Sequence, residues 1–167
     1  MKNLLILRHA KSSWNHPELS DHDRPLNKRG KHDAPRMGAL IAELGLTPDA
    51  IYSSTARRAR DTALIVAEAC GFAGEIQFDR DLYHAGLETF SGIIRGLENE
   101  IDCVLLVGHN PDLEELVDWF ADDAPWLPTA ALVQIEFPIQ IWSDLDQEPA
   151  GRLCGIWRPR ELSGFQG

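Results

Sequence analysis

A short apolar run near the N-terminus, ending abruptly in polar residues, is the feature that most constrains the fold. Residues 4–7 (LLIL) are typical of a strand buried on both faces of a sheet. Arg8 and His9 follow directly, at the strand end beyond which open α/β sheets bind ligands. Arg8 offers a permanently charged, planar guanidinium that suits phosphate or carboxylate, and His9 offers a nitrogen that can act as a base or a nucleophile. The pair therefore indicates phosphoryl chemistry. The alternative is two polar residues where a strand meets solvent.

The 167 residues have the size and composition of one globular domain, with 44% hydrophobic and 25% charged residues. We expect a single domain over residues 1–162 and a flexible tail at 163–167. The formal net charge of −10 gives a field that repels nucleic acid and anionic membranes. We therefore expect neither as a partner, and any basic site must be local.

Cysteine usage and the N-terminus favour a cytoplasmic protein. Cys70, Cys103 and Cys154 are odd in number, far apart and in apolar contexts, so we expect reduced core residues. The first residues show no signal-peptide pattern, and no apolar run approaches the length of a membrane span.

A long polar loop, residues 10–26, leaves the expected ligand edge, and its length indicates a functional segment. The next helix has apolar residues at helical spacing over 37–44. Its start is open. Asn27 would cap a helix that contains Pro35, whereas Asp33 would cap a shorter helix with Pro35 in its first turn.

Three arginines fall near the start of a second helix. A short strand within residues 48–54 is followed by this helix from about Thr55, with Arg57, Arg58 and Arg60 in its first turns. Cations are unfavourable at the positive end of a helix dipole, and a bound anion would offset that cost. We expect at least two of the three to be solvated and leave open whether one binds an anion.

A second buried strand repeats the opening pattern. Residues 103–107 (CVLLV) lead to His109, and Asn110 is expected to cap the following helix with Pro111 at its first position. A single histidine in such a turn is more often structural. Because two buried strands each end at a histidine, we favour an anion ligand here.

The remaining chain completes an α/β pattern. A helix is expected at residues 90–97, and strands are expected at 75–78, 129–137 and 153–157. We treat four tryptophans as core or rim packing because no basic stripe accompanies them; they are Trp119, Trp126, Trp142 and Trp157.

These motifs, taken in order, resemble the histidine phosphatase (phosphoglycerate mutase-like) superfamily. The matching segments are RHA at 8–10, Asn15, Ser54, RARDTA at 58–63 and GHNP at 108–111. Residues 20–30 and 105–111 are similar to the small SixA-type phosphohistidine phosphatases within it. The resemblance implies an α/β fold, a three-layer α/β/α sandwich with a mostly parallel central sheet.

The resemblance also implies residue roles. His9 matches the nucleophile that carries a covalent phosphoryl group, Arg8 and Arg58 match phosphate-clamping arginines, and His109 matches a second pocket histidine. No metal and no cofactor are implied, because arginines can neutralise the charge that develops in phosphoryl transfer.

Three further positions are transferred from the resemblance. Asn15 matches a phosphate-contacting position, and Asp21 and Arg24 match SixA-type residues that flank the pocket. Arg57 and Arg60 are not carried over.

The sequence departs from the family pattern in two places. Ala10 stands where many relatives have glycine, and the catalytic glutamate of the mutases has no convincing counterpart, although Glu88 lies in the right interval. The general acid is therefore open between Asp21, His84 and no protein acid. The labile P–N bond of phosphohistidine needs little protonation, which favours that substrate class.

We expect a metal-independent phosphatase, a monomer, that hydrolyses phosphohistidine on a protein partner in signal transduction. A small-molecule phosphomonoesterase with the same pocket and a non-catalytic phosphate- or phosphoprotein-binding module remain alternatives. A zinc site on His9 and His109 is disfavoured because two nearby arginines would repel a cation. Residues 12–25 and the segment around Tyr83 and His84 are the candidates for substrate selection.

Overall fold

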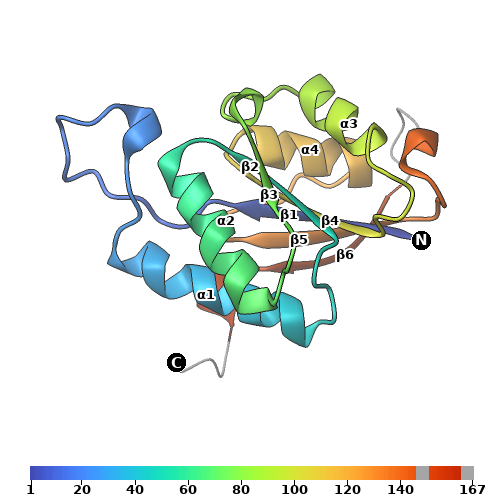
Figure 1. The fold of residues 1–167 in the computed structure, drawn as a ribbon, viewed down its shortest axis with the longest axis horizontal. Helices are drawn as coiled ribbons and strands as arrows, with labels where there is room; N and C mark the ends of the chain where they lie inside the picture. The colour runs from blue at the N-terminus through green and yellow to red at the C-terminus, as the bar shows by residue number, and fades with distance from the viewer. Residues whose placement is uncertain (146–150, 163–167) are drawn as a thin grey trace.

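A six-stranded mixed sheet in the order β3-β2-β4-β1-β5-β6 forms the middle layer (Figure 1). The protein is represented by a computed structural model that describes residues 1–145 and 151–162; the expected tail at 163–167 lies outside them. The strands are β1 (Lys2–Arg8), β2 (Ala50–Ser54), β3 (Ile76–Asp79), β4 (Cys103–Gly108), β5 (Leu132–Phe137) and β6 (Arg152–Trp157). β1 to β4 run parallel, β5 runs antiparallel to β1, and β6 runs antiparallel to β5, so five of the six strands point the same way, which confirms the mostly parallel sheet.

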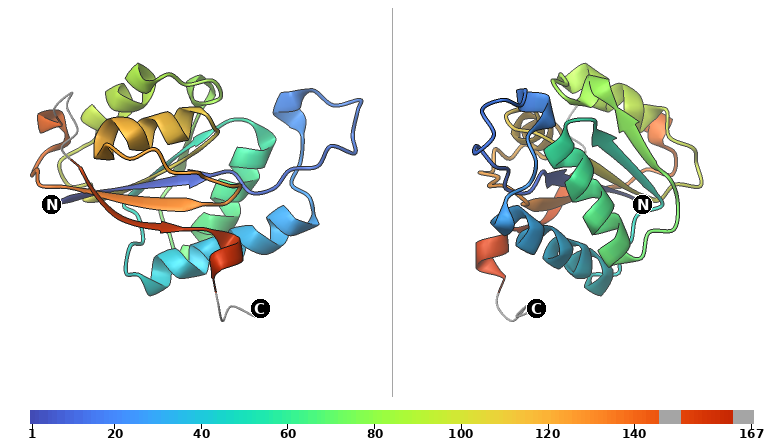
Figure 2. Two further views of the ribbon diagram at one scale, coloured as in Figure 1. Left: turned by 180° about the vertical axis from the view of Figure 1, so that it is seen from behind. Right: turned by 60° about the vertical axis from the view of Figure 1, so that its left-hand side comes forward.

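Two pairs of helices cover the sheet, one on each face (Figures 1 and 2). They are α1 (Lys28–Glu43) with α2 (Arg57–Cys70), and α3 (Leu87–Arg95) with α4 (Asp112–Ala121). Leu5 packs in the core with α1 and α2, whereas Leu4 packs in the core with α3 and α4. Side chains alternate across a strand, so a run that is apolar at every position is buried on both faces. The predicted three-layer sandwich is therefore confirmed.

The pairing of β1 with β4 determines where the site lies. The two strands are parallel and in register, with Arg8 opposite Gly108. The His9 N–H donates to the Gly108 carbonyl at 3.0 Å, so His9 and His109 leave the sheet side by side at its carboxyl edge. The polar loop of residues 10–26 extends outward from the same edge (Figure 1).

The structure decides between the two predicted starts of α1. Asn27 is the N-cap, and its side chain accepts a hydrogen bond from the Gly30 N–H at 2.9 Å. Pro35 lies within the helix. The alternative in which Asp33 caps a shorter helix is wrong.

The predicted cap of α4 is also wrong. Pro111 occupies the N-cap position, and no side chain caps the helix. The Asn110 side-chain amide instead donates to Glu114 Oε1 at 3.0 Å and to the Leu127 carbonyl at 2.9 Å. Asn110 therefore ties the site to the segment before β5.

One prediction of burial fails: Cys154 is exposed, although Cys70 and Cys103 are buried as expected. Of the tryptophans expected in the core or at its rim, Trp142 is fully buried, whereas Trp119 and Trp126 are exposed. Cys154 lies on the edge strand β6, where every second side chain can face solvent.

No helix in the described part of the chain is both long and apolar enough to cross a bilayer.

Replacing Gly30 by alanine should disturb the base of the polar loop. A Cβ at this position would lie 2.2 Å from the Lys11 carbonyl oxygen, a backbone atom. We expect Gly30→Ala to lower the free energy of unfolding by about 1–3 kcal/mol, as overpacking does. The control is Gly92→Ala in α3, where a Cβ would meet nothing within 4 Å. This substitution should raise the free energy of unfolding by about 0.5–1 kcal/mol. Urea unfolding measures both, and equal effects would contradict this account.

Candidate active site

A cavity of about 300 Å³ lies at the carboxyl edge of the sheet, where β1, the polar loop, α2 and β4 meet. Its lining residues are Arg8, His9, Lys11, Ser12, Trp14, Asp21, Arg24, Arg58, His109, Asn110 and Thr129. Six of the seven residues singled out in the sequence are therefore brought together. The seventh, Asn15, is exposed and does not line the cavity; its backbone N–H donates to Ser13 Oγ at 3.1 Å.

His9 is buried and held in one tautomer. Its Nδ1 lies 2.8 Å from the Ala10 carbonyl oxygen, which can only accept, so Nδ1 carries the hydrogen and Nε2 keeps its lone pair. Burial lowers the pKa of His9 to about 3, and the positive charges of Arg58 and Arg8 act in the same direction. The imidazole is therefore neutral at physiological pH and able to act as a nucleophile.

Thr62 joins the His9 turn to α2. Its hydroxyl accepts from the Ala10 N–H at 2.9 Å and donates to the Arg58 carbonyl at 2.6 Å. The side chain is fully buried. The sequence matched Thr62 only as part of a motif, and no local spacing signals its positioning role, because Ala10 and Thr62 are 52 residues apart.

His109 faces His9, with 5.1 Å between the ring centroids. Its Nε2 lies 2.8 Å from Ser54 Oγ, and that oxygen accepts from the Ala56 N–H. We assign the hydroxyl hydrogen of Ser54 to Nε2, and this assignment places the imidazole hydrogen of His109 on Nδ1. Burial, followed by the charge of Arg58, lowers the pKa of His109 to about 3.

Of the three arginines at the start of α2, only Arg58 lines the cavity. It is buried, whereas Arg57 and Arg60 are exposed. Arg57 pairs with Asp61, and the Arg60 guanidinium lies over the Phe78 ring. The expectation that at least two of the three are solvated is confirmed.

Unpartnered polar atoms gather at this cavity. Among the described residues, five buried side-chain nitrogen or oxygen atoms have no hydrogen-bond partner, and four belong to residues of the cavity. These four are Arg8 Nε, Arg58 Nε, His109 Nδ1 and Asn110 Oδ1. Leaving buried donors unpaired is costly, and three of the four are donors. Arg8, Arg58 and His109 all line the cavity, and an oxyanion is the ligand class that their charge and their N–H groups favour.

Asp21 organises the outer side of the cavity. Its carboxylate accepts from Arg24 Nε at 3.1 Å, from Arg58 Nη2 at 3.1 Å and from the Tyr83 hydroxyl. The hydrogen bond from Tyr83, followed by the charge of Arg58, lowers the pKa of Asp21 to about 2. Asp21 is therefore ionised at neutral pH and holds no proton to donate.

The other candidate acids lie farther out. His84 is exposed beside Tyr83, with 4.1 Å between the ring centroids, and does not line the cavity. Glu88 is exposed on α3 and lines a different hollow. No carboxylic acid among the residues of this cavity is thus held protonated.

Comparison with known proteins identifies similar chains. Residues 4–102 match the family model described as the histidine phosphatase superfamily, branch 1. An uncharacterised chloroplastic protein of Arabidopsis thaliana is 34% identical over 144 residues, which cover 80% of this chain and 66% of that protein. A 2,3-bisphosphoglycerate-dependent phosphoglycerate mutase of Thermobifida fusca is 40% identical over 73 residues, covering 42% of this chain and 30% of the mutase.

The fold also has similar solved structures. A protein of Agrobacterium tumefaciens provisionally named phosphohistidine phosphatase SixA has a crystal structure that superposes with a TM-score of 0.80. It is 29% identical, and the superposition covers 95% of this chain and 98% of that chain.

Thr62→Val should destabilise the protein and weaken the site without removing any group that faces the cavity. The buried Ala10 N–H loses its acceptor, which costs about 1–3 kcal/mol of unfolding free energy. Thr62→Ser keeps the hydroxyl and should retain most of the stability. Urea unfolding distinguishes the two, and equal stabilities would show that the hydroxyl does not matter.

The two buried histidines should make stability depend on pH. Their pKa values are lowered to about 3 in the folded state, against about 6.5 in an unfolded chain. Between these values the unfolded state binds more protons, so the free energy of unfolding falls as pH decreases from about 6.5 towards 3.

Each histidine contributes up to about 1.4 kcal/mol per pH unit inside that window. Urea midpoints at about pH 7 and pH 5 measure the dependence, and His109→Gln should remove about half of it. An unchanged dependence in that variant would contradict the burial of a neutral His109.

Proposed function

Because this chain belongs to the histidine phosphatase superfamily, we propose that it is a metal-independent phosphatase that works through a phosphoryl group carried on His9. Family membership and the likeness to a SixA-type structure support phosphatase activity. The single observation that carries the proposal is the neutral His9, with Nδ1 bound to the Ala10 carbonyl and Nε2 free, among three unpartnered donors.

In the first step, His9 Nε2 attacks the phosphorus of the substrate. An N–P bond forms on His9 as the bond from phosphorus to the leaving group breaks, and the leaving group takes up a proton from solvent. The phosphoryl oxygens carry the developing charge, and we assign Arg8, Arg58 and His109, which line the cavity, to bind them. Since these donors are fixed before the substrate arrives, little reorganisation is needed.

In the second step, water attacks the phosphorus of phosphorylated His9. The N–P bond breaks, the attacking water gives up a proton to solvent, His9 returns to its neutral form, and inorganic phosphate leaves. The Ala10 carbonyl keeps the hydrogen on Nδ1 throughout, because it remains the acceptor of that hydrogen bond.

For the substrate class we propose phosphohistidine on a protein partner. An alkyl phosphate needs an acid to protonate its leaving oxygen, and Asp21 is ionised. Phosphohistidine has a labile P–N bond and places less demand on an acid. The likeness to a protein provisionally named phosphohistidine phosphatase SixA supports the same class.

We also propose that Asp21 and Arg24 shape the outer side of the cavity. Asp21 links Arg58 to Arg24, and Arg24 Nη1 donates to Ser12 Oγ at 2.9 Å. Asn15 has no proposed role in binding phosphate. A zinc site receives no support: within residues 1–145 and 151–162 no three histidine, cysteine or acidic side chains form a metal-binding group.

Phosphate release should depend on His9 and not on a metal ion. We expect release from a phosphohistidine-bearing protein to continue in excess chelator and to fall at least about a thousandfold in His9→Ala. The matched control is His32→Ala, a histidine largely exposed on α1, which should leave the rate unchanged.

The ratio between substrates tests the proposed class. Hydrolysis of phosphohistidine should exceed hydrolysis of an alkyl phosphate ester under the same conditions. Equal rates would favour the small-molecule phosphomonoesterase. Tight phosphate binding with no release from either substrate would favour a binding module.

A further inference from the structure

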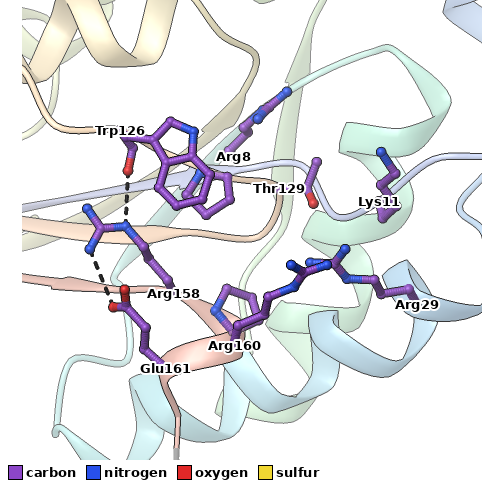
Figure 3. Close-up of a pocket in the computed structure, with 10 residues that line it drawn as sticks. Arg8, Lys11, Arg29, Trp126, Thr129, Arg158, Arg160 and Glu161 are labelled. Atoms are coloured by element: carbon purple, nitrogen blue, oxygen red, sulfur yellow. Dashed lines mark hydrogen bonds and ion pairs between the residues drawn. The ribbon is translucent and has the colours of Figure 1, made fainter.

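A second and larger cavity lies beside the candidate active site (Figure 3). Its volume is about 450 Å³, and it has Arg8, Lys11 and Thr129 in common with the smaller cavity that contains His9. A substrate whose phosphoryl group lies against His9 can therefore extend directly into it.

The charged lining of this cavity is strongly cationic. Five basic residues and one acid line it: Arg8, Lys11, Arg29, Arg158, Arg160 and Glu161. In Figure 3, Arg29 from α1 and Arg160 from the C-terminal turn Pro159–Glu161 point toward one another. Such a concentration of positive charge stands out in a chain of net charge −10.

Only part of this charge is neutralised within the described chain. Arg158 pairs with Glu161 at 3.4 Å, and Arg29 pairs with Asp33 at 3.4 Å. Lys11 and Arg160 make no ion pair with any described residue. Their positive charges are therefore available to an incoming anion.

Two exposed tryptophans accompany the cavities. Trp126 lines the larger cavity and is 68% exposed, and Trp14 lines the smaller one and is 72% exposed. Each has an arginine guanidinium over its ring, Arg158 at 5.8 Å and Arg24 at 3.5 Å. Tryptophan and arginine are the residues that most often dominate protein–protein binding energy.

We propose that this cationic cavity, together with Trp126 and Trp14, docks an acidic polypeptide segment next to the phosphohistidine of the substrate protein. This inference rests on the proposed function and adds that the enzyme recognises acidic residues beside the phosphohistidine of its substrate protein. Carboxylates of the segment would pair with Arg160 and Lys11 while its apolar side chains cover the tryptophans. A long nucleic acid fits less well, because the rest of the surface repels a polyanion.

The test compares three substrates and two charge reversals. The substrates are free phosphohistidine, a phosphohistidine peptide flanked by glutamates, and the same peptide flanked by glutamines. Arg160→Glu reverses a charge of the cavity. Lys31→Glu makes the same change at an exposed residue of α1 that lines neither cavity.

We expect Arg160→Glu to lower kcat/KM for the glutamate-flanked peptide about five- to tenfold. The rate on free phosphohistidine should stay the same, and Lys31→Glu should have little effect on any substrate. Wild type should prefer the glutamate-flanked peptide, with a preference that weakens as salt is added.

Different failures have different meanings. Absence of turnover of all three phosphohistidine substrates by wild type overturns the proposed function and this inference with it. Normal turnover of free phosphohistidine with equal rates on the two peptides overturns only the docking of an acidic segment. Stronger competition by a single-stranded RNA than by polyglutamate would show that the cavity prefers nucleic acid.

Discussion

The parallel pairing of β1 with β4 is the constraint on which the rest of the site depends. It places Arg8 opposite Gly108, and the His9 N–H bonds to the Gly108 carbonyl. Both strands are buried on both faces, so a shift in register would displace the whole core. The burial of β1 and β4 thus supplies the free energy that holds His9 and His109 in position. The imidazoles do not need to contribute to that stability themselves.

The charges gathered at the site act against this stability. Two neutral imidazoles, Arg8 and Arg58 converge at the start of α2, where the helix dipole is positive and no side chain caps the helix. Asp21 offsets part of this positive charge, but three buried donors stay unpaired. Strained or unsatisfied groups that persist in a well-packed fold are typical of functional sites. A bound phosphoryl group would supply the negative charge that this arrangement lacks.

Local sequence patterns predicted the elements well, because buried strands and amphipathic helices have strong periodicity. The carboxyl-edge positions of His9 and His109 followed from the same patterns. The cap of α4 was not predictable, because Asn110 bonds to Glu114 and Leu127, partners set by tertiary packing. The cationic cavity was also not predicted. Its basic residues come from both ends of the chain, so the sequence shows no cluster of basic residues near Trp126.

The most direct test of the account is to trap the phosphorylated enzyme. A single turnover of radiolabelled phosphoramidate, quenched in alkaline detergent, should leave label on the wild-type protein that is stable to alkali and released by acid, as expected of phosphohistidine. His9→Ala should carry no label, and peptide mapping of the wild type should place it on His9. Turnover without any labelled protein, or label that persists in His9→Ala, would contradict nucleophilic catalysis by His9.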